Sequence, residues 1–352
     1  MGLSSRFHSF SELVSEELAQ TVPSPIWRIR AILSGHPSRS MALLPPDIRS
    51  SGAFLRLTLF QRRRRFYNRM LYSALHNKIS QKLWLDKICP EAAPPMTHYV
   101  SGNRLIRIGG KGKPVGTRSE VSDLVRSDNP IFIKPADAGR GVGAYQVSSG
   151  KEGVLINGNF LGNAAFQQWI RELPLSFTIS NVIEQSKETR SFFPGALNTV
   201  RIMTATSFLD YRAVVLGAVL KCATSRSIPT DNFKSGAGGT VSSIDLETGV
   251  LGPCVGFDEA RFERTLSDTH PETGAVVAGE ILPHWQELHE KISWLASILP
   301  RPGVVGWDVA VRDNGITVVE INTLPGIDAV QSGVSLLDTE AKRRILSEMR
   351  MI

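Results

Sequence analysis

The sequence is poor in cysteine and has no long apolar run, and both absences exclude whole classes of protein. Three cysteines occur in 352 residues, Cys89, Cys222 and Cys254, and no two of them form a C-x-x-C pair. Scattered cysteines in odd number give neither a disulfide framework nor a zinc motif, and they fit a reducing compartment. No run of about 18 apolar residues occurs, so the sequence predicts no membrane-spanning helix. We therefore expect a cytoplasmic protein.

Several common catalytic motifs are missing as well. The sequence contains neither a Walker A loop nor Gly-x-Ser-x-Gly, and its 7 histidines form no metal-binding pattern. The segment from His284 to His289 differs from His-Glu-x-x-His and is interpreted as helix surface. What remains is a composition typical of a globular protein, with 42% hydrophobic and 21% charged residues.

Positive charge is concentrated in the first part of the chain, although the net charge is only +7. Residues 1–130 hold 20 Lys and Arg against 9 Asp and Glu, whereas residues 131–352 hold 20 against 24. Apolar residues at steps of three and four predict a basic, helical region over residues 1–75. Its four consecutive arginines, Arg62 to Arg65, could meet nucleic acid, anionic lipid or an anionic substrate, or could belong to a solvated or docking helix. No nucleic-acid motif accompanies them.

The pattern changes from helix to strand near residue 99. A long helix is predicted from Ala53 to Leu85, and short β-like runs divided by glycine follow it, including one over 178–184. Helical segments are predicted between the strands, over 120–126, 163–172, 283–299 and 337–349. This order indicates an α+β protein behind a helical front.

The first motif with chemical content is a glycine-rich loop between two predicted strands. The apolar run Ile131–Phe132–Ile133 ends in Lys134, and Gly139, Gly141 and Gly143 follow at alternate positions. Glycine has no Cβ, so the backbone N–H groups of such a loop can approach phosphate oxygens closely. Lys134 would add a positive charge to the same phosphates. The alternative is a plain glycine hairpin.

The second motif is an apolar hairpin around Asp313-Asn314-Gly315. A two-residue Asn-Gly turn would pair Asp308 with Ile321, whereas a three-residue turn would pair Asp308 directly with Glu320. In the second register Asn322 shares the face of Glu320. Two opposed carboxylates repel each other, and a divalent cation between them would relieve the repulsion. Oxygen donors without His or Cys favour Mg²⁺. On this argument, removing one acid should stabilise the protein without metal.

Together these motifs resemble the ATP-grasp superfamily, whose members grip ATP between two α+β lobes. The resemblance is more specific to the sugar-transfer-associated ATP-grasp family, because of three further stretches. These are Val182 to Gln185, Leu197 to Thr204, and Asp231 to Gly236 running on to Asp245 to Gly249. The resemblance covers about residues 70–345, and the first 60 or so residues match nothing known.

The resemblance assigns roles to individual residues. Lys134 would hold the α- and β-phosphates beneath the glycine loop, Lys78 would be a second phosphate ligand, and Glu184 would contact the adenine. The usual Asp is missing between Asn77 and Lys78, which weakens that second assignment. The metal ligands would be Asp308, Glu320 and Asn322, and the residues lining the phosphoryl-transfer and acceptor region would be Arg201, Lys221 and Asn232.

The family also implies an organisation and an activity. We expect the helical region over 1–75, a lobe with the glycine loop over 76–195, and a metal-binding lobe over 196–352. The implied activity is ATP- and Mg²⁺-dependent ligation of a small-molecule or peptide carboxylate to a nucleophile, through an acyl phosphate. A kinase acting on a hydroxyl or sugar, and a non-catalytic ATP-binding protein, remain alternatives. Loops 221–239 and 324–333 are expected to form the substrate pocket, and the oligomeric state is not predicted.

Overall fold

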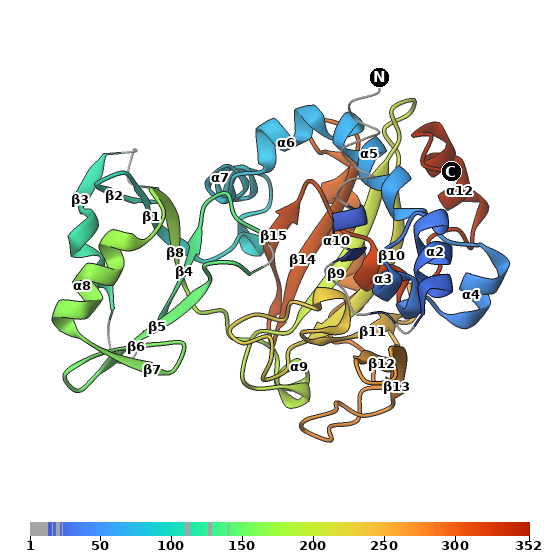
Figure 1. The fold of residues 1–352 in the computed structure, drawn as a ribbon. Helices are drawn as coiled ribbons and strands as arrows, with labels where there is room; N and C mark the ends of the chain where they lie inside the picture. Colours follow the sequence, from blue (N-terminus) through green and yellow to red (C-terminus); the bar gives the residue numbers. More distant parts are fainter. Residues whose placement is uncertain are drawn as a thin grey trace.

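Two antiparallel sheets with helices around them make up the fold (Figure 1). The computed structural model describes residues 13–15, 17–18, 22, 24–109, 113–125, 129–139 and 141–352. The predicted α+β class is confirmed. Within these ranges, the helices are all too short or too polar to cross a membrane.

From residue 25 onward, helices fill the front of the chain, as predicted, and most of residues 1–23 lies outside the described residues. They are α2 (Pro25–Ser34), α3 (Ser38–Leu43), α4 (Pro46–Ser51), α5 (Leu57–Tyr67), α6 (Arg69–Leu75) and α7 (Lys78–Ile88). The single helix predicted over 53–85 is wrong, because α5, α6 and α7 occupy its place. Asn68 separates the first two, and its buried side-chain amide donates to the carbonyls of Val304 and Thr323. Asn77 caps the N-terminus of α7 with its side-chain oxygen.

The first sheet has eight strands in the order β3-β2-β1-β8-β4-β5-β6-β7. Its strands are β1 (Met96–Ser101), β2 (Arg104–Arg107), β3 (Pro114–Thr117), β4 (Ile131–Pro135), β5 (Tyr145–Gly150), β6 (Gly153–Ile156), β7 (Asn159–Gly162) and β8 (Ser176–Asn181). Helix α8 (Asn163–Glu172) packs on it with Phe166 and Ile170. The helix predicted over 120–126 is the 3-10 helix η2 (Arg118–Leu124), and Arg126 lies outside the described residues. The strand predicted over 178–184 ends early, at Asn181.

The second sheet has seven strands in the order β13-β12-β11-β10-β9-β14-β15. These are β9 (Thr199–Thr206), β10 (Ala213–Cys222), β11 (Thr240–Ile244), β12 (Leu251–Asp258), β13 (Glu263–Ser267), β14 (Val304–Arg312) and β15 (Gly315–Asn322). The other elements are α9 (Lys187–Phe192), α10 (Trp285–Ser297), α11 (Asp328–Gln331), α12 (Glu340–Glu348), η1 (Pro90–Ala92) and η3 (Lys234–Gly236).

The second sheet is covered on both faces. Val200, Ile202 and Trp307 pack on one side in a core that includes α7 and α10. Met203 and Ala205 point the other way, into a core formed with α3, α5 and α12. Successive side chains of a strand point to opposite faces of the sheet. Val200 and Ile202 of β9 therefore face the first core, and Met203 and Ala205 face the second.

The N-terminal helices belong to the cores of the second sheet. Leu43, Leu57 and Phe60 lie in the core on one face of this sheet, and Leu71 and Leu75 lie in the core on the other. The division of the chain at residues 75 and 195 therefore stays a prediction. In the structure, the strands of the first sheet lie within 96–181 and those of the second within 199–322.

The hairpin of β14 and β15 has the predicted pairing but a different turn. Asp308 pairs with Glu320, as expected. The predicted three-residue turn is wrong, because Arg312 pairs with Gly315 and only two residues lie between them. An irregularity between Asp308 and Val309 shifts the register by one residue, so that Asp308 pairs with Glu320. A β-bulge thus produces the pairing that the three-residue turn was expected to produce.

Candidate active site

A cavity of about 410 Å³ lies between the two sheets. Its wall includes Lys134 and Thr178 from the first sheet and Thr199 and Val318 from the second. Helix α7, which lies between the two sheets in Figure 1, adds Lys78. The cavity is mixed in character, with aliphatic and aromatic residues beside charged ones, as small-molecule sites commonly are.

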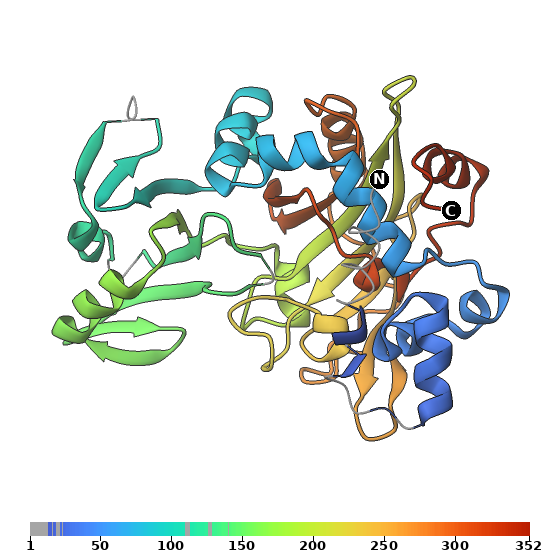
Figure 2. The same ribbon diagram turned by 45° about the horizontal axis from the view of Figure 1, so that its top comes forward.

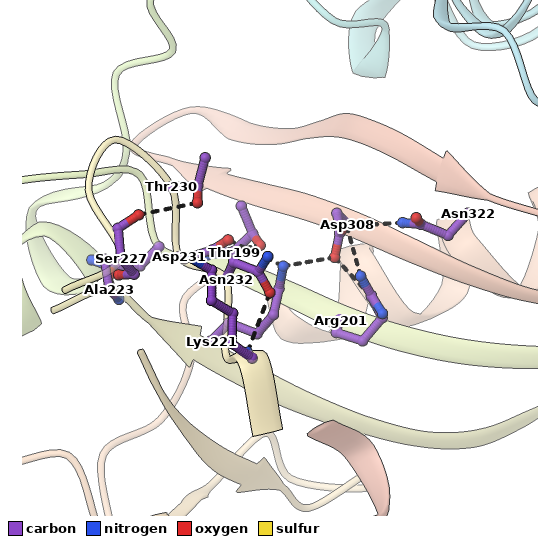
Figure 3. A network of polar contacts seen from close by, with 12 residues as sticks. Thr199, Arg201, Lys221, Ala223, Ser227, Thr230, Asp231, Asn232, Asp308 and Asn322 are labelled. Carbon is purple, nitrogen blue, oxygen red and sulfur yellow. Dashed lines mark hydrogen bonds and ion pairs between the residues drawn. The ribbon is translucent and has the colours of Figure 1, made fainter. Parts of the chain in front are cut away.

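Asp308 does not itself line this cavity, and three side chains of the second sheet hold it (Figure 3). Arg201 on the neighbouring strand donates from Nε to Oδ1 at 2.8 Å and from Nη2 to Oδ2 at 2.9 Å. Lys221 Nζ lies 3.0 Å from Oδ1, and Asn322 Nδ2 donates to Oδ2 at 2.9 Å. Burial alone would raise the pKa of Asp308, but Arg201 and Lys221 outweigh it and hold that pKa well below its usual range. Asp308 is therefore a buried anion at neutral pH.

Lys221 connects Asp308 to a second carboxylate. Its Nζ lies 3.1 Å from Asp231 Oδ1, and the other oxygen of Asp231 accepts from the backbone N–H of Thr199 at 2.8 Å and from the Thr199 hydroxyl. Burial lowers the pKa of Lys221, but Asp231 and Asp308 raise it above its usual value. Asp231 was not among the predicted site residues. The sequence signal for Asp231 is its place beside Asn232 in the Asp231 to Gly236 stretch.

Glu320 has a separate cationic partner. Its Oε1 lies 3.3 Å from Lys78 Nζ, which also donates to the carbonyl of Ala138 in the glycine loop. The side-chain amide of Gln81, one turn later on α7, bonds both the N–H and the carbonyl of Ile321 at 2.8 Å. Lys78 and Gln81 thus cover the edge strand β15 at the proposed metal ligands.

The assumption of an unrelieved repulsion between Asp308 and Glu320 is therefore wrong. Arg201 and Lys221 neutralise Asp308, and Lys78 neutralises Glu320. The opposed carboxylates do not by themselves require a divalent cation. Whether Asp308, Glu320 and Asn322 bind metal stays a proposal.

Lys134 is the site cation without an ion-pair partner among the described residues. Its ammonium lies 5.1 Å from the ring centroid of Phe132, and it lines the cavity. Burial lowers its pKa, and the nearby charge of Lys78 adds to this, while Glu320 opposes it. A half-buried cation that faces a cavity is suited to an anionic ligand such as a phosphate.

The glycine loop spans the gap between β4 and β5, which pair as a hairpin as predicted. Gly141 and Gly143 have φ of +72° and +69°, a region that favours glycine. A Cβ on Gly141 would lie 2.9 Å from the hydroxyl of Thr230, so the loop contacts the chain that follows β10. Gly139 has open space around its missing Cβ. The positions of Gly141 and Gly143 therefore favour glycine, whereas the space at Gly139 would admit a Cβ.

The two remaining predicted residues lie at the margin of the site. Glu184 is exposed and lines the cavity in the segment between β8 and α9, which joins the two sheets. Asn232 is half-buried beside Asp231, and its side-chain oxygen accepts from the N–H of Lys234 at 3.3 Å. Neither position contradicts the predicted role, and neither tests it.

The donor set fits a magnesium ion that arrives with phosphates. In the described part of the chain, no three His, Cys, Asp or Glu side chains cluster closely enough to hold a metal unaided. Carboxylate and amide oxygens of Glu320 and Asn322 are donors that Mg²⁺ accepts, and Mg²⁺ usually takes its remaining ligands from water and phosphate. With Arg190 and Glu184, which line the cavity, the site has five cations and four carboxylates. This excess of positive charge suits a polyphosphate.

Comparison with known families agrees with this geometry. The model for the family described as "Sugar-transfer associated ATP-grasp" matches residues 61–342. The chain belongs to the sugar-transfer-associated ATP-grasp family, which confirms the resemblance inferred from the motifs. A search of curated proteins found no matching relative.

Solved structures of ATP-grasp enzymes are similar to this chain at low identity. D-alanine–D-alanine ligase from Bacillus anthracis is 14% identical, with 79% of this chain and 66% of that chain covered and a TM-score of 0.39. D-alanine–D-alanine ligase from Helicobacter pylori is 15% identical, with 78% of this chain and 60% of that chain covered and a TM-score of 0.40. Biotin carboxylase from Campylobacter jejuni is 12% identical, with 79% of this chain and 46% of that chain covered and a TM-score of 0.42. The chain thus spans two thirds or less of the length of these proteins.

Proposed function

We propose that this chain is an ATP- and Mg²⁺-dependent ligase that joins a carboxylate to a nucleophile, most often an amine. The observation that carries the proposal is the position of Arg201. It uses Nε and Nη2 to hold Asp308, and its Nη1 has no partner among the described residues. A guanidinium fixed in this way, in a positively charged site, is suited to orient an incoming carboxylate.

In the proposed reaction, a carboxylate oxygen of the substrate attacks the γ-phosphorus of ATP. The bond from this phosphorus to the bridging oxygen breaks, and ADP leaves with the electron pair. The nucleophile then attacks the acyl carbon, the carbon–oxygen bond to phosphate breaks, and an amine loses its proton. These steps conserve atoms and charge and form a carbon–nitrogen bond when the nucleophile is an amine.

The roles of the chain's residues follow from their places. Lys134 and the glycine loop would bind the phosphates, Glu184 would meet the adenine, and Arg201 with Lys221 would orient the reacting groups. Mg²⁺, held by Glu320 and Asn322 with Asp308 beside them, would offset charge on the phosphate oxygens.

A kinase is the second candidate, because Asp231 is a carboxylate on the cavity wall. It could act as a base toward a hydroxyl. Its oxygens already accept hydrogen bonds from Lys221 and twice from Thr199, which reduces their ability to take a proton. We therefore favour the ligase.

The fate of the γ-phosphate separates the two reactions. A screen of carboxylates and amines for ADP release should find activity only when both are present. Hydroxylamine should then trap the acyl phosphate as a hydroxamate, and phosphorus-31 spectra should show inorganic phosphate. A new phosphoester without inorganic phosphate would establish a kinase instead. Nucleotide binding without turnover on any pair would support a non-catalytic ATP-binding protein.

The substrates are proposed only as classes. Residues 229–231 of the predicted substrate loop line the cavity. All of 324–333 is described, and none of these residues lines it, so the first loop is the better candidate for recognising the substrate. By analogy with the family description, the product would belong to polysaccharide or secondary metabolism, made in the cytoplasm from a small-molecule or peptide carboxylate.

A further inference from the structure

The turn between β9 and β10 places large apolar side chains in solvent. Leu209 is 83% exposed, Tyr211 is 52% exposed and Phe208 is 38% exposed. Both ribbon views show this yellow-green turn projecting at the top of the molecule (Figures 1 and 2). Consecutive apolar residues on a projecting turn have no role in the core of the fold, and such patches commonly mark an interaction surface.

The adjoining ends of α5 and α6 extend this apolar surface. The ring of Tyr67 lies 5.2 Å from that of Phe208, and the ring of Phe66 lies 5.2 Å from that of Tyr67. Phe66 is 57% exposed, and Met70 is 58% exposed. We call Phe66, Met70, Phe208, Leu209 and Tyr211 together the hairpin-tip patch.

Arginines surround the hairpin-tip patch. Arg69 is exposed beside Met70, and the side chain of Arg212 at the turn is 80% exposed. Arg344 on α12 is also near, because the backbone N–H of Arg212 and the charges of Arg212 and Arg344 lower the pKa of Asp210. The acids at the turn are Asp210 and Glu348, so positive charge predominates by one over these two and the three arginines.

The turn is held in its exposed conformation by polar contacts. Glu348 on α12 accepts from the N–H of Phe208 at 2.6 Å and from the hydroxyl of Ser207 at 2.9 Å. The same hydroxyl accepts from the N–H of Leu209 at 3.0 Å. The apolar side chains are therefore presented by a braced turn, and little conformational entropy would be lost when they are buried.

We propose that the hairpin-tip patch binds an anionic lipid surface, with Leu209 and Tyr211 entering the membrane interface and the arginines meeting the headgroups. A projecting turn favours a deformable lipid layer over a protein partner, because protein interfaces need about 800 Å² on each side. Apolar insertion together with several cations provides the two signals that stable peripheral binding needs. The proposal does not depend on the proposed ligase activity.

The proposal also fixes an orientation. Thr199 and Lys221 of the candidate site lie at the other ends of β9 and β10, seven residues from Thr206, or about 23 Å at roughly 3.3 Å per residue. Docking of the tip would thus leave the cavity open to the aqueous side of the membrane.

Sedimentation with large unilamellar vesicles tests the proposal on the full chain. We expect binding to phosphatidylcholine vesicles that contain about one third phosphatidylserine, and much weaker binding to phosphatidylcholine alone. The double variant Leu209→Ser/Tyr211→Ser should weaken binding about tenfold or more. Arg69→Glu/Arg212→Glu should do the same, and added salt should weaken binding of the unchanged protein.

Matched controls come from the first sheet. Leu175→Ser/Phe160→Ser changes two residues that are 79% and 60% exposed, and Arg104→Glu/Arg107→Glu changes two exposed arginines of β2. Both should bind vesicles as the unchanged protein does. Absence of vesicle binding, or equal losses in the control variants, would overturn the proposal. Concentration-dependent dimerisation that is lost in Leu209→Ser/Tyr211→Ser, without vesicle binding, would identify a contact between two copies instead.

Discussion

Arg201 and Asp308 lie opposite each other on neighbouring antiparallel strands, and two hydrogen bonds of 2.8 and 2.9 Å join their side chains. Gly306 lies beside this pair, where a Cβ would lie 2.9 Å from Cβ of Pro325 and 3.4 Å from Cδ of Arg201. The two hydrogen bonds fix the orientation of the guanidinium relative to the carboxylate. The pair is the structural basis of the first prediction.

Asp308→Ala should lower the free energy of unfolding by about 3 kcal/mol, because it leaves Arg201 and Lys221 buried without their shared anion. This reverses the expectation from sequence that loss of one acid stabilises the protein. Urea denaturation measures the change. Glu152→Ala, which removes an exposed acid at the turn between β5 and β6, should change stability little. A stabilised Asp308→Ala variant would contradict the ion-pair account.

Glu320→Gln should abolish turnover while the protein stays folded, because it removes a proposed metal ligand together with the partner of Lys78. Titration of activity with Mg²⁺ and circular dichroism of the variant test this. Glu188→Gln, on exposed α9, is the control and should retain activity. Full activity of Glu320→Gln in saturating Mg²⁺ would exclude Glu320 as a metal ligand.

Lys134→Ala should weaken ATP binding by roughly 1.5–3 kcal/mol, the range for a hydrogen bond to a charged group. Isothermal titration calorimetry measures it directly. Lys151→Ala removes an exposed lysine at the turn after β5 and should leave the affinity unchanged. Equal affinities of both variants would mean that Lys134 does not contact the nucleotide.

Gly141→Val should damage ATP binding about as much as Lys134→Ala, because valine disfavours a φ of +72° and its Cβ would meet Thr230. Gly139→Ala provides the contrast, since nothing lies within 4 Å of the added Cβ. Calorimetry on both variants should show a clear loss for the first and a small change for the second. Two equal small changes would reduce the loop to a plain hairpin.

His36 should make the protein less stable in mild acid. It is fully buried, and burial lowers its pKa from 6.5 to about 4. Between these values the unfolded chain binds a proton that the folded chain does not, so this contribution is complete above pH 6.5 and falls as the pH drops toward 4. The loss is on the order of 3 kcal/mol. Urea denaturation at pH 7 and pH 5 gives the difference in the free energy of unfolding between the two pH values. This difference should be smaller in His36→Gln than in the unchanged protein, and His284→Gln should keep the full difference.

The sequence was most informative where local patterns decide the structure. The apolar runs on both sides of Asp-Asn-Gly predicted the hairpin of β14 and β15, and the Ile131 to Tyr145 run predicted a strand, loop and strand. The pairing of Asp308 with Glu320 was predicted through a three-residue turn, whereas the structure reaches it through a two-residue turn and a β-bulge. These patterns depend on residues close together in the chain.

Such local patterns could not predict contacts between segments that are distant in the sequence. The ion pair of Lys78 and Glu320 joins residues that are 242 positions apart in the sequence, and only the tertiary structure brings them together. The break at Asn68 follows from hydrogen bonds to Val304 and Thr323, and local propensity gives no sign of it. Asp231 becomes a site residue only because β9 and β10 bring Thr199 and Lys221 beside it.

The packing of the N-terminal helices on the second sheet has a practical consequence for expression of the family segment alone. The family model begins at residue 61 and ends at 342. Phe60 and Leu57 before it, and Leu346 and Met349 after it, lie in the same core as Met203. A shortened protein restricted to 61–342 would present that face of the sheet to water, and we expect it to aggregate even though every residue proposed for the reaction is retained.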